Sequence, residues 1–175
     1  MADETVFTIE DRTSGDYSTG TGGSWRLVTD NVMGGVSAGK LTVDNVDNRP
    51  CLRLRGQVST ENRGGFIQAA LDLESESLRD ASAYEGVAIE VYGNGEPYNL
   101  HLRQDGRWLP WQAFRTSFTA SSQWQTHYLP FAMFKPYKTS AKLKPDRLTR
   151  IGLVAIGRDF DADLCLGKIR YYSSR

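Results

Sequence analysis

The side chains in this sequence that could perform chemistry do not form a recognisable catalytic set. The two histidines, His101 and His127, lack the His-x-x-x-His spacing or the neighbouring cysteines of a zinc site. The segment Gly20–Gly23 is not a phosphate-binding loop, because no strand precedes it and no helix follows it. The sequence therefore predicts a protein that is not an enzyme, with no catalytic residue, no cofactor and no catalytic metal.

Three alternating aspartates are the clearest candidates for metal ligands. Asp159, Asp161 and Asp163 offer the hard oxygen atoms that Ca²⁺ prefers. However, no glycine lies within this group and no downstream glutamate completes an EF-hand loop. The pattern favours a solvated turn before the last strand, and a structural Ca²⁺ remains an open alternative.

Binding is better supported, because polar and aromatic side chains alternate with apolar ones along several segments. If Leu100 and Leu102 point inward, the intervening residues of the same strand must point outward. The same parity, applied to neighbouring segments, predicts one exposed patch that could bind a protein or a carbohydrate. Mere solvation of the sheet face is the alternative. The predicted patch comprises Gln68, Glu90, Tyr92, Asn99, His101, Arg103, Trp108, Trp111 and Arg115. Trp25 and Trp124 are interpreted as structural.

Two loops that end in glycine pairs form a second candidate region. Each is a polar turn closing just before an apolar strand, and glycine allows backbone conformations that other residues avoid. These residues could form a binding rim, or they could fasten the two loops to each other. The second, structural role is favoured because the N–H and C=O groups of a buried turn need hydrogen-bond partners. The residues are Asp30, Asn31, Met33, Gly34, Gly35, Ser37, Glu61, Asn62, Gly64 and Gly65.

The elements that must position these residues are predicted to be short strands. About ten apolar or alternating runs recur, long helical patterns are scarce, and glycine is frequent, at 17 residues. Short helical turns are expected only at 74–83 and 131–137. This pattern is typical of an all-β fold of two packed antiparallel sheets. The expected strands span residues 25–28, 36–43, 50–58, 65–73, 86–92, 98–104, 111–118, 123–129, 149–156 and 163–172.

The ordered motifs resemble those of the complex I intermediate-associated protein 30 family. The resemblance is carried by Asp30-Asn-Val-Met-Gly-Gly-Val-Ser37, Gly56-Gln-Val-Ser59, Asn62 and Gly64-Gly-Phe66, and later by Tyr98-Asn-Leu-His-Leu-Arg103 and Leu129-Pro-Phe131. It implies a jelly-roll β-sandwich of the galactose-binding-domain-like type. Eukaryotic members are mitochondrial factors that hold a subassembly of respiratory complex I. This chain lacks their presequence and N-terminal extension, which points to a free-standing bacterial member.

Composition limits the remaining function classes. The formal net charge is zero, with 21 basic and 21 acidic residues, which is not expected of a nucleic-acid binder. No apolar run approaches a membrane span, and the acidic start lacks a secretory signal, so a cytoplasmic location is expected. Cys51 and Cys165 are 114 positions apart and are predicted to be reduced thiols. A single domain of 175 residues is expected, with a flexible segment at 14–24.

Two functions follow as hypotheses. The first is a non-catalytic protein-interaction module, a scaffold or assembly factor. The alternative is a module that binds a carbohydrate or another small ligand on an exposed sheet face.

Overall fold

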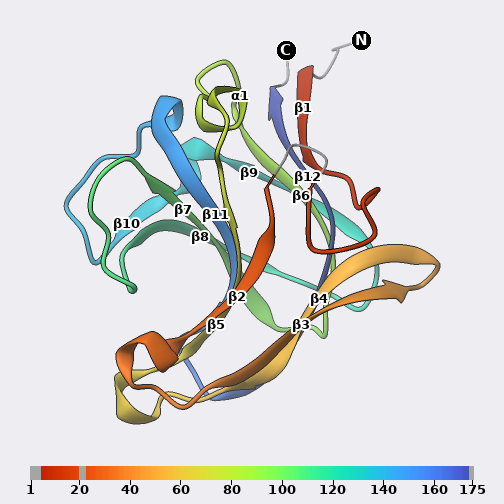
Figure 1. The fold of residues 1–175 in the computed structure, drawn as a ribbon, viewed down its shortest axis with the longest axis vertical. Helices are drawn as coiled ribbons and strands as arrows, with labels where there is room; N and C mark the ends of the chain where they lie inside the picture. Colours follow the sequence, from red (N-terminus) through yellow and green to blue (C-terminus); the bar gives the residue numbers. More distant parts are fainter. Residues whose placement is uncertain (1–4, 20–22, 174–175) are drawn as a thin grey trace.

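Two antiparallel six-stranded sheets pack face to face in the computed structural model, which describes residues 5–19 and 23–173 (Figure 1). One, named here the cleft sheet, contains β10 (Lys135–Tyr137), β8 (Ala113–Thr119), β7 (Pro97–Gln104), β11 (Leu148–Ile156), β5 (Phe66–Asp72) and β2 (Trp25–Thr29) in that order. The other, the back sheet, has the order β3 (Ala38–Val46), β4 (Arg49–Val58), β12 (Phe160–Ser173), β6 (Gly86–Tyr92) and β9 (Gln125–Pro130), with β1 (Thr5–Glu10) also paired to β12. The predicted all-β jelly-roll sandwich is confirmed.

Alternation along the strands explains why the sheets pack. Leu52 and Leu54 of β4 and Leu100 and Leu102 of β7 are each at most 1% exposed, whereas the residues between them point away from the core. A period of two places every second side chain on the same face, so one face of each sheet becomes apolar. Burial of these two faces against each other is the main stabilising contribution to the fold.

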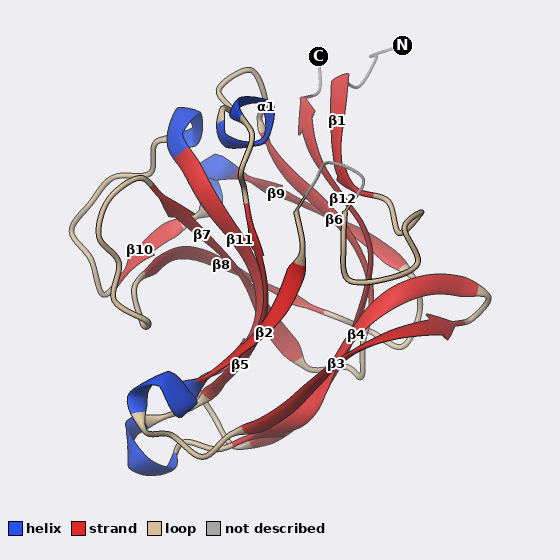
Figure 2. Ribbon diagram, in the orientation of Figure 1, coloured by secondary structure: helices blue, strands red, loops and turns tan. Residues whose placement is uncertain are grey.

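Helices are short, as the sequence predicts (Figure 2). The turn expected at 74–83 contains α1 (Glu76–Arg79), which Ser75 caps through a hydrogen bond from the Leu78 amide. Single 3₁₀ turns span Asp30–Met33, Glu61–Arg63, Phe131–Met133 and Pro145–Arg147. The helical turn expected at 131–137 is only half right, because its second half is strand β10. Among the described residues, no helix has the length and apolar character needed to cross a bilayer.

The N-terminal segment belongs to the sandwich rather than to a separate piece. β1 pairs with the end of β12, and the last residue of β1, Glu10, is buried. Glu10 forms an ion pair with Arg12 and accepts a hydrogen bond of 2.9 Å from the indole of Trp25. Because Trp25 is part of the core, this buried network anchors the segment. Gly20–Gly22, at the centre of the stretch predicted to be flexible, lie outside the described residues.

Strands that are neighbours in sequence often lie in different sheets. β6 belongs to the back sheet, whereas β5, β7 and β8 belong to the cleft sheet. β11 lies between β7 and β5, in register through Leu153 opposite Leu100 and Ala69. This crossing between sheets decides which of the predicted site residues can meet.

Candidate binding cleft

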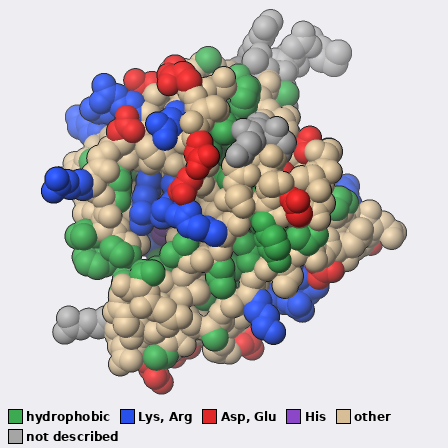
Figure 3. Space-filling view, in the orientation of Figure 1, with side chains coloured by type: hydrophobic (Ala, Val, Ile, Leu, Met, Phe, Trp, Pro, Cys, Tyr) green, Lys and Arg blue, Asp and Glu red, His purple; other side chains and the backbone are tan. Residues whose placement is uncertain are grey.

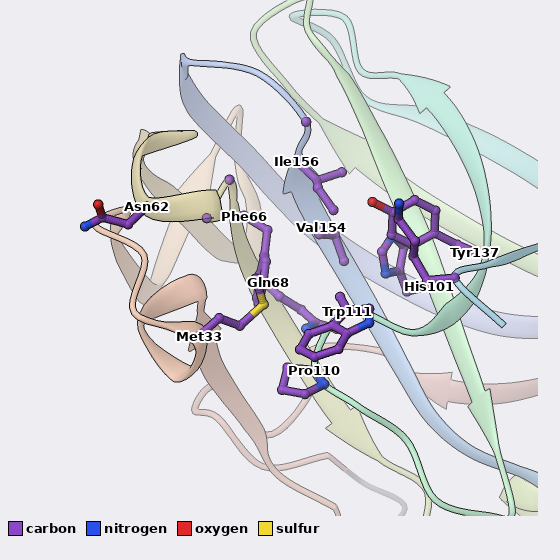
Figure 4. Close-up of a pocket in the computed structure, with 14 residues that line it drawn as sticks. Met33, Asn62, Phe66, Gln68, His101, Pro110, Trp111, Tyr137, Val154 and Ile156 are labelled. Atoms are coloured by element: carbon purple, nitrogen blue, oxygen red, sulfur yellow. The ribbon is translucent and has the colours of Figure 1, made fainter.

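A cleft of about 510 Å³ opens on the outward side of the cleft sheet. Its floor is formed by β5, β11 and β7, and two loops form opposite walls (Figure 4). The first wall is the Asp30–Ser37 loop together with residues 62–65, and the second is the loop that joins β7 to β8. Figure 4 shows Met33 on one wall and Pro110 and Trp111 on the other, with Gln68 between them. The cleft therefore has apolar walls above a partly polar floor.

The polar floor consists of Gln68 and His101. Gly152 lies beneath Gln68, and a Cβ at Gly152 would meet the Gln68 Oε1 atom at 2.0 Å. The His101 Nε2 atom is buried and has no hydrogen-bond partner among the described residues. Burial, and then the charges of Arg115 and Arg103, lower the pKa of His101 to about 3. The imidazole is therefore neutral near pH 7, and its Nε2 retains the capacity to donate or accept one hydrogen bond, according to the tautomer.

Arg103 builds a wall of the cleft instead of facing its centre. Its guanidinium donates hydrogen bonds of 3.2 Å to the carbonyls of Leu109 and Pro110 and of 3.3 Å to that of Gln112. Three bonds from one planar group fix the course of this loop. Trp111, 42% exposed, is thereby held at the edge of the cleft. Arg103 does not line this cleft itself, and it positions the loop that does.

The opposite wall is held by a buried aspartate. Asp30 is fully buried and accepts hydrogen bonds from the Ser37 amide (3.0 Å), the Ser37 hydroxyl (2.5 Å), and the amides of Gly65 (2.6 Å) and Phe66 (3.3 Å). Gly35 and Gly64 pack directly against its carboxylate, since a Cβ at either would come within 2.4 Å of a carboxylate atom. The glycine pairs and Asp30 therefore form one structural unit joining the two loops.

The remaining motif-loop residues divide between the cleft and the surface. Met33 and Asn62 line the cleft, and Asn62 has a left-handed backbone, with φ of 56°. Asn31 is exposed, and its side-chain amide donates a hydrogen bond to the Thr29 hydroxyl. Glu61 is also exposed, and its backbone N–H donates to the Ser59 hydroxyl. Gly34 and Gly65 adopt positive φ values of 83° and 127°, which glycine favours.

Ser37 does not have the setting of a nucleophile, although Gly35-Val-Ser-Ala-Gly39 matches the spacing of a hydrolase Gly-x-Ser-x-Gly turn. Its hydroxyl bonds to Asp30, and the Ser59 amide donates to it at 2.9 Å. A strand rather than a helix follows the serine, and its side chain is 2% exposed. Ser37 is a structural residue.

Arg115 and Asn99 extend the site beyond the cleft. The Arg115 guanidinium lies 3.6 Å from the centre of the Tyr137 ring, a cation–π contact. Asn99, Arg115 and Tyr137 line an open hollow of about 890 Å³, with Met133 and Lys135 on its outer side. Because Tyr137 also lines the cleft, the two depressions adjoin.

Three residues of the predicted patch are misplaced. Glu90 and Tyr92 belong to β6, so they lie on the outward side of the back sheet. There Glu90 is within ion-pair distance of Arg49 and Arg170, and Tyr92 makes an edge-on contact with Trp124. Trp108, predicted to be an exposed anchor, is half-buried. Its indole donates a 2.5 Å bond to the Gln104 carbonyl, and its ring contacts Phe114.

The two cysteines also differ from the prediction. Cys51 and Cys165 form a disulfide between the paired strands β4 and β12, with Cα atoms 5.5 Å apart. The prediction of reduced thiols is wrong because sequence separation says nothing about strand pairing. The cytoplasmic location remains a prediction, and the disulfide weighs against it because such bonds persist in oxidising compartments.

The three aspartates do not converge on one point. Asp159 accepts hydrogen bonds from the amide and hydroxyl of Thr60, and Asp163 forms a two-bond ion pair with Arg53. Asp161 is exposed. Within the described residues, no group of three or more His, Cys, Asp or Glu could hold a metal ion.

Some cleft residues escaped the sequence analysis. Val154 and Ile156, on the strand expected at 149–156, line the floor but are not in the predicted patch. Tyr137 ends the helical turn expected at 131–137 and Lys138 follows it, yet both line the cleft. The alternation of Lys135 and Tyr137 was the available signal, but three residues are too few to separate a strand from a turn.

The fold defines the structural class of the chain. It is a galactose-binding-like β-sandwich, a fold shared with several solved carbohydrate-binding modules. It superimposes on the family 11 module of a cellulosomal cellulase of Clostridium thermocellum with a TM-score of 0.76, at 12% identity over 95% of this chain and 94% of that one. The same module in complex with a β-1,3-1,4-mixed-linked tetrasaccharide gives 0.74 at 12% identity, covering 96% and 95%. A family 30 carbohydrate-binding module gives 0.68 at 15% identity, covering 98% and 89%.

Within that class, the sequence assigns the family. Residues 13–166 match the model of the complex I intermediate-associated protein 30 family, so the chain belongs to that family. No curated protein sequence matches significantly. The family expected from the motifs is thus confirmed.

Proposed function

We propose that this chain is a non-catalytic module that binds another protein through the cleft and its rim. The observation that carries the proposal is the exposed apolar surface of the two wall loops and of the neighbouring hollow. Val32 (60% exposed) and Val36 (47%) lie on one wall loop, and Leu109 (49%) lies beside Trp111 on the other. Met133 (51%) flanks the neighbouring hollow. Exposed apolar side chains grouped around a cleft are typical of an interaction surface.

Val32, Val36 and Leu109 are exposed on the wall loops but do not line the cleft, so a ligand that covers them extends beyond it, which favours a macromolecular partner. Aromatic and arginine side chains carry much of the binding energy at protein interfaces, and here Trp111 and Tyr137 line the cleft while Arg115 lines the adjoining hollow. Membership of the family agrees with a scaffold or assembly role. The motif-loop residues contribute by holding the wall that carries Met33.

Site-specific photo-crosslinking in the native cell tests the proposal. A benzoylphenylalanine at position 111 should capture a defined protein, which should then bind the purified chain in calorimetry. The matched control places the same group at Tyr128, which is 49% exposed on β9 of the back sheet. Capture that is equal from both positions, or that an excess of unlabelled wild-type chain does not reduce, would contradict use of the cleft.

A carbohydrate is the second candidate ligand, and two observations favour it. Gln68 and the unpartnered Nε2 of His101 at the floor suit a hydroxyl, which both donates and accepts. The solved structures with the same fold include a module bound to a tetrasaccharide. A glycan array followed by calorimetry tests this candidate. A hit that Trp111→Ala abolishes without changing the melting temperature would support it, and silence across the array would remove it.

A further inference from the structure

The charge of the molecule is unevenly divided between its two sheets. The charged residues in the described strands of the cleft sheet are five basic ones and a single acid: Arg26, Arg103, Arg115, Lys135, Arg150 and Asp72. The back-sheet strands carry six basic and five acidic residues, although the whole chain is neutral. The space-filling view shows Lys and Arg side chains gathered in and beside the hollow left of centre (Figure 3). The strands of the cleft sheet therefore carry a local basic excess, although the whole chain is neutral.

The charges are not neutralised within the sheet. Asp72 is shared by Arg26, at 2.7 Å, and Arg150, at 3.0 Å. Arg115 stacks on Tyr137 and forms no ion pair with a carboxylate of the described residues. Arg103 donates its hydrogen bonds to backbone carbonyls, which carry no net charge and so do not neutralise the guanidinium. Arg115 therefore remains free to meet a ligand, as do the exposed Lys135 and Lys138.

Burial, neighbouring cations and the Asp72 carboxylate all act on the pKa of Arg103. Burial, and then the charges of Arg150 and Arg26, lower the pKa of Arg103 to about 10. Asp72 offsets Arg26 and Arg150, whereas Arg115 and Lys135 have no ion-pair partner among the described residues. An anionic ligand would supply a counter-charge for these two, and a surface that carries one sign of charge also attracts such a ligand over a distance.

The shape of the region indicates what the anion is attached to. The apolar walls around Met33 and Trp111 lead across Tyr137 into the second hollow, where Arg115 and Lys135 lie. Lys138 lines the cleft beside Tyr137. An occupant that fills both depressions needs an apolar group at one end and acidic groups a few residues further on. An extended chain provides this spacing, because its reach is about 3.3 Å per residue.

We propose that the cleft binds an extended acidic segment of the partner protein, with one large apolar side chain between Met33 and Trp111 and carboxylates at Arg115 and Lys138. This inference rests on the proposed protein-binding function and specifies the chemistry of the partner. The rim residues surround the segment, and Arg115 makes the decisive charged contact.

A displayed library of random twelve-residue peptides, selected against the full chain, tests the inference. Enriched peptides should contain several Asp or Glu residues and one large apolar residue. Their affinity should fall about tenfold in Arg115→Gln, the typical effect of losing one charge-assisted hydrogen bond. Arg115→Lys should lose less, because it keeps the charge. The matched control, Arg55→Gln, removes an exposed arginine from β4 of the back sheet and should change nothing.

The variants also separate binding from folding. Should Arg115→Gln fail to fold, Lys135→Gln combined with Lys138→Gln removes two exposed charges beside the same path and should weaken binding comparably. Binding should decline between 50 and 500 mM NaCl, because salt screens exposed charges.

Each alternative outcome overturns a different statement. Enrichment of peptides without acidic residues refutes the acidic segment and leaves the protein-binding function standing. Binding of oligogalacturonate in place of any peptide assigns the anion site to an acidic glycan and overturns both. Binding of a neutral β-glucan tetrasaccharide alone, unchanged in Arg115→Gln, overturns both as well. If the selection enriches no peptide and position 111 gives no crosslink, both the acidic segment and the protein-binding function are refuted.

Discussion

Replacing Asp30 by asparagine tests the most specific structural statement made about the site. In the native chain Oδ1 accepts from the Ser37 amide, and Oδ2 accepts from the Ser37 hydroxyl and from the amides of Gly65 and Phe66. An asparagine has one oxygen and one NH₂ group. Whichever way it is turned, the NH₂ group faces at least one backbone N–H, and a buried donor loses its acceptor. That loss costs about 1–3 kcal/mol, and the bonds that remain lose their charge assistance. We expect the free energy of unfolding to fall by roughly 2–4 kcal/mol.

Urea unfolding followed by the fluorescence of the four tryptophans measures this change. For a chain of this size the same loss lowers the melting temperature by about 5–15 °C. Ser37→Ala removes one donor to Asp30 and the acceptor of the Ser59 amide, and it should cost about 1–3 kcal/mol. Asp161→Asn is the control, because Asp161 is exposed and its side chain has no hydrogen bond among the described residues. A loss for Asp30→Asn no larger than that of the control would refute the view that Asp30 joins the two loops.

Three further predictions follow from the same structure. Gly152→Ala should change the free energy of unfolding by less than about 1 kcal/mol, because the Gln68 side chain that the new methyl group displaces is flexible. The same variant should weaken ligand binding in the cleft. Denaturation and calorimetry on one sample measure the stability and the binding. The pKa of His101 is about 3 in the folded state and near 6.5 in the unfolded state, so the stability that this group contributes is complete above pH 6.5 and is lost as the pH falls toward 3. The difference in unfolding free energy between wild type and His101→Gln should therefore change across that window and stay constant from pH 7 to 8. A difference that does not depend on pH would contradict the burial of this ring. Replacing both Cys51 and Cys165 by alanine should lower the free energy of unfolding by about 2–4 kcal/mol relative to the oxidised protein. Mass spectrometry should find neither cysteine alkylated before reduction and both alkylated after it, and alkylation of both in the native protein would disprove the disulfide.

The strands could be predicted because their information is local. Leu52 and Leu54, or Leu100 and Leu102, alternate with polar residues over a few positions, and this period directly sets which face is buried. Residues 5–10 were not recognised as part of the sandwich, and β10 was missed because it is only three residues long. In both cases pairing with a distant strand supplies the stability that the segment itself lacks.

The site could be predicted only in part. Parity placed Gln68, Asn99, His101 and Arg115 on the same sheet face, and the structure brings them together with Trp111 at or beside the cleft. Parity also placed Glu90 outward, which is true, but it could not tell which of two sheets that outward face belonged to. Alternation reports the side of a strand, and a sandwich has two outer sides.

The sequence by itself determined the all-β class, the inward and outward sets on most strands, and the two glycine-paired loops, because each depends on interactions among residues within about ten positions. Only the tertiary structure decided that β6 leaves the cleft sheet, that Arg103 holds a wall loop, that Cys51 meets Cys165, and that Asp30 serves four donors at once. The physical reason is that these contacts join positions that are distant in the sequence or that the chain's path brings together. Their energies depend on which strands become neighbours, and no local pattern records that choice.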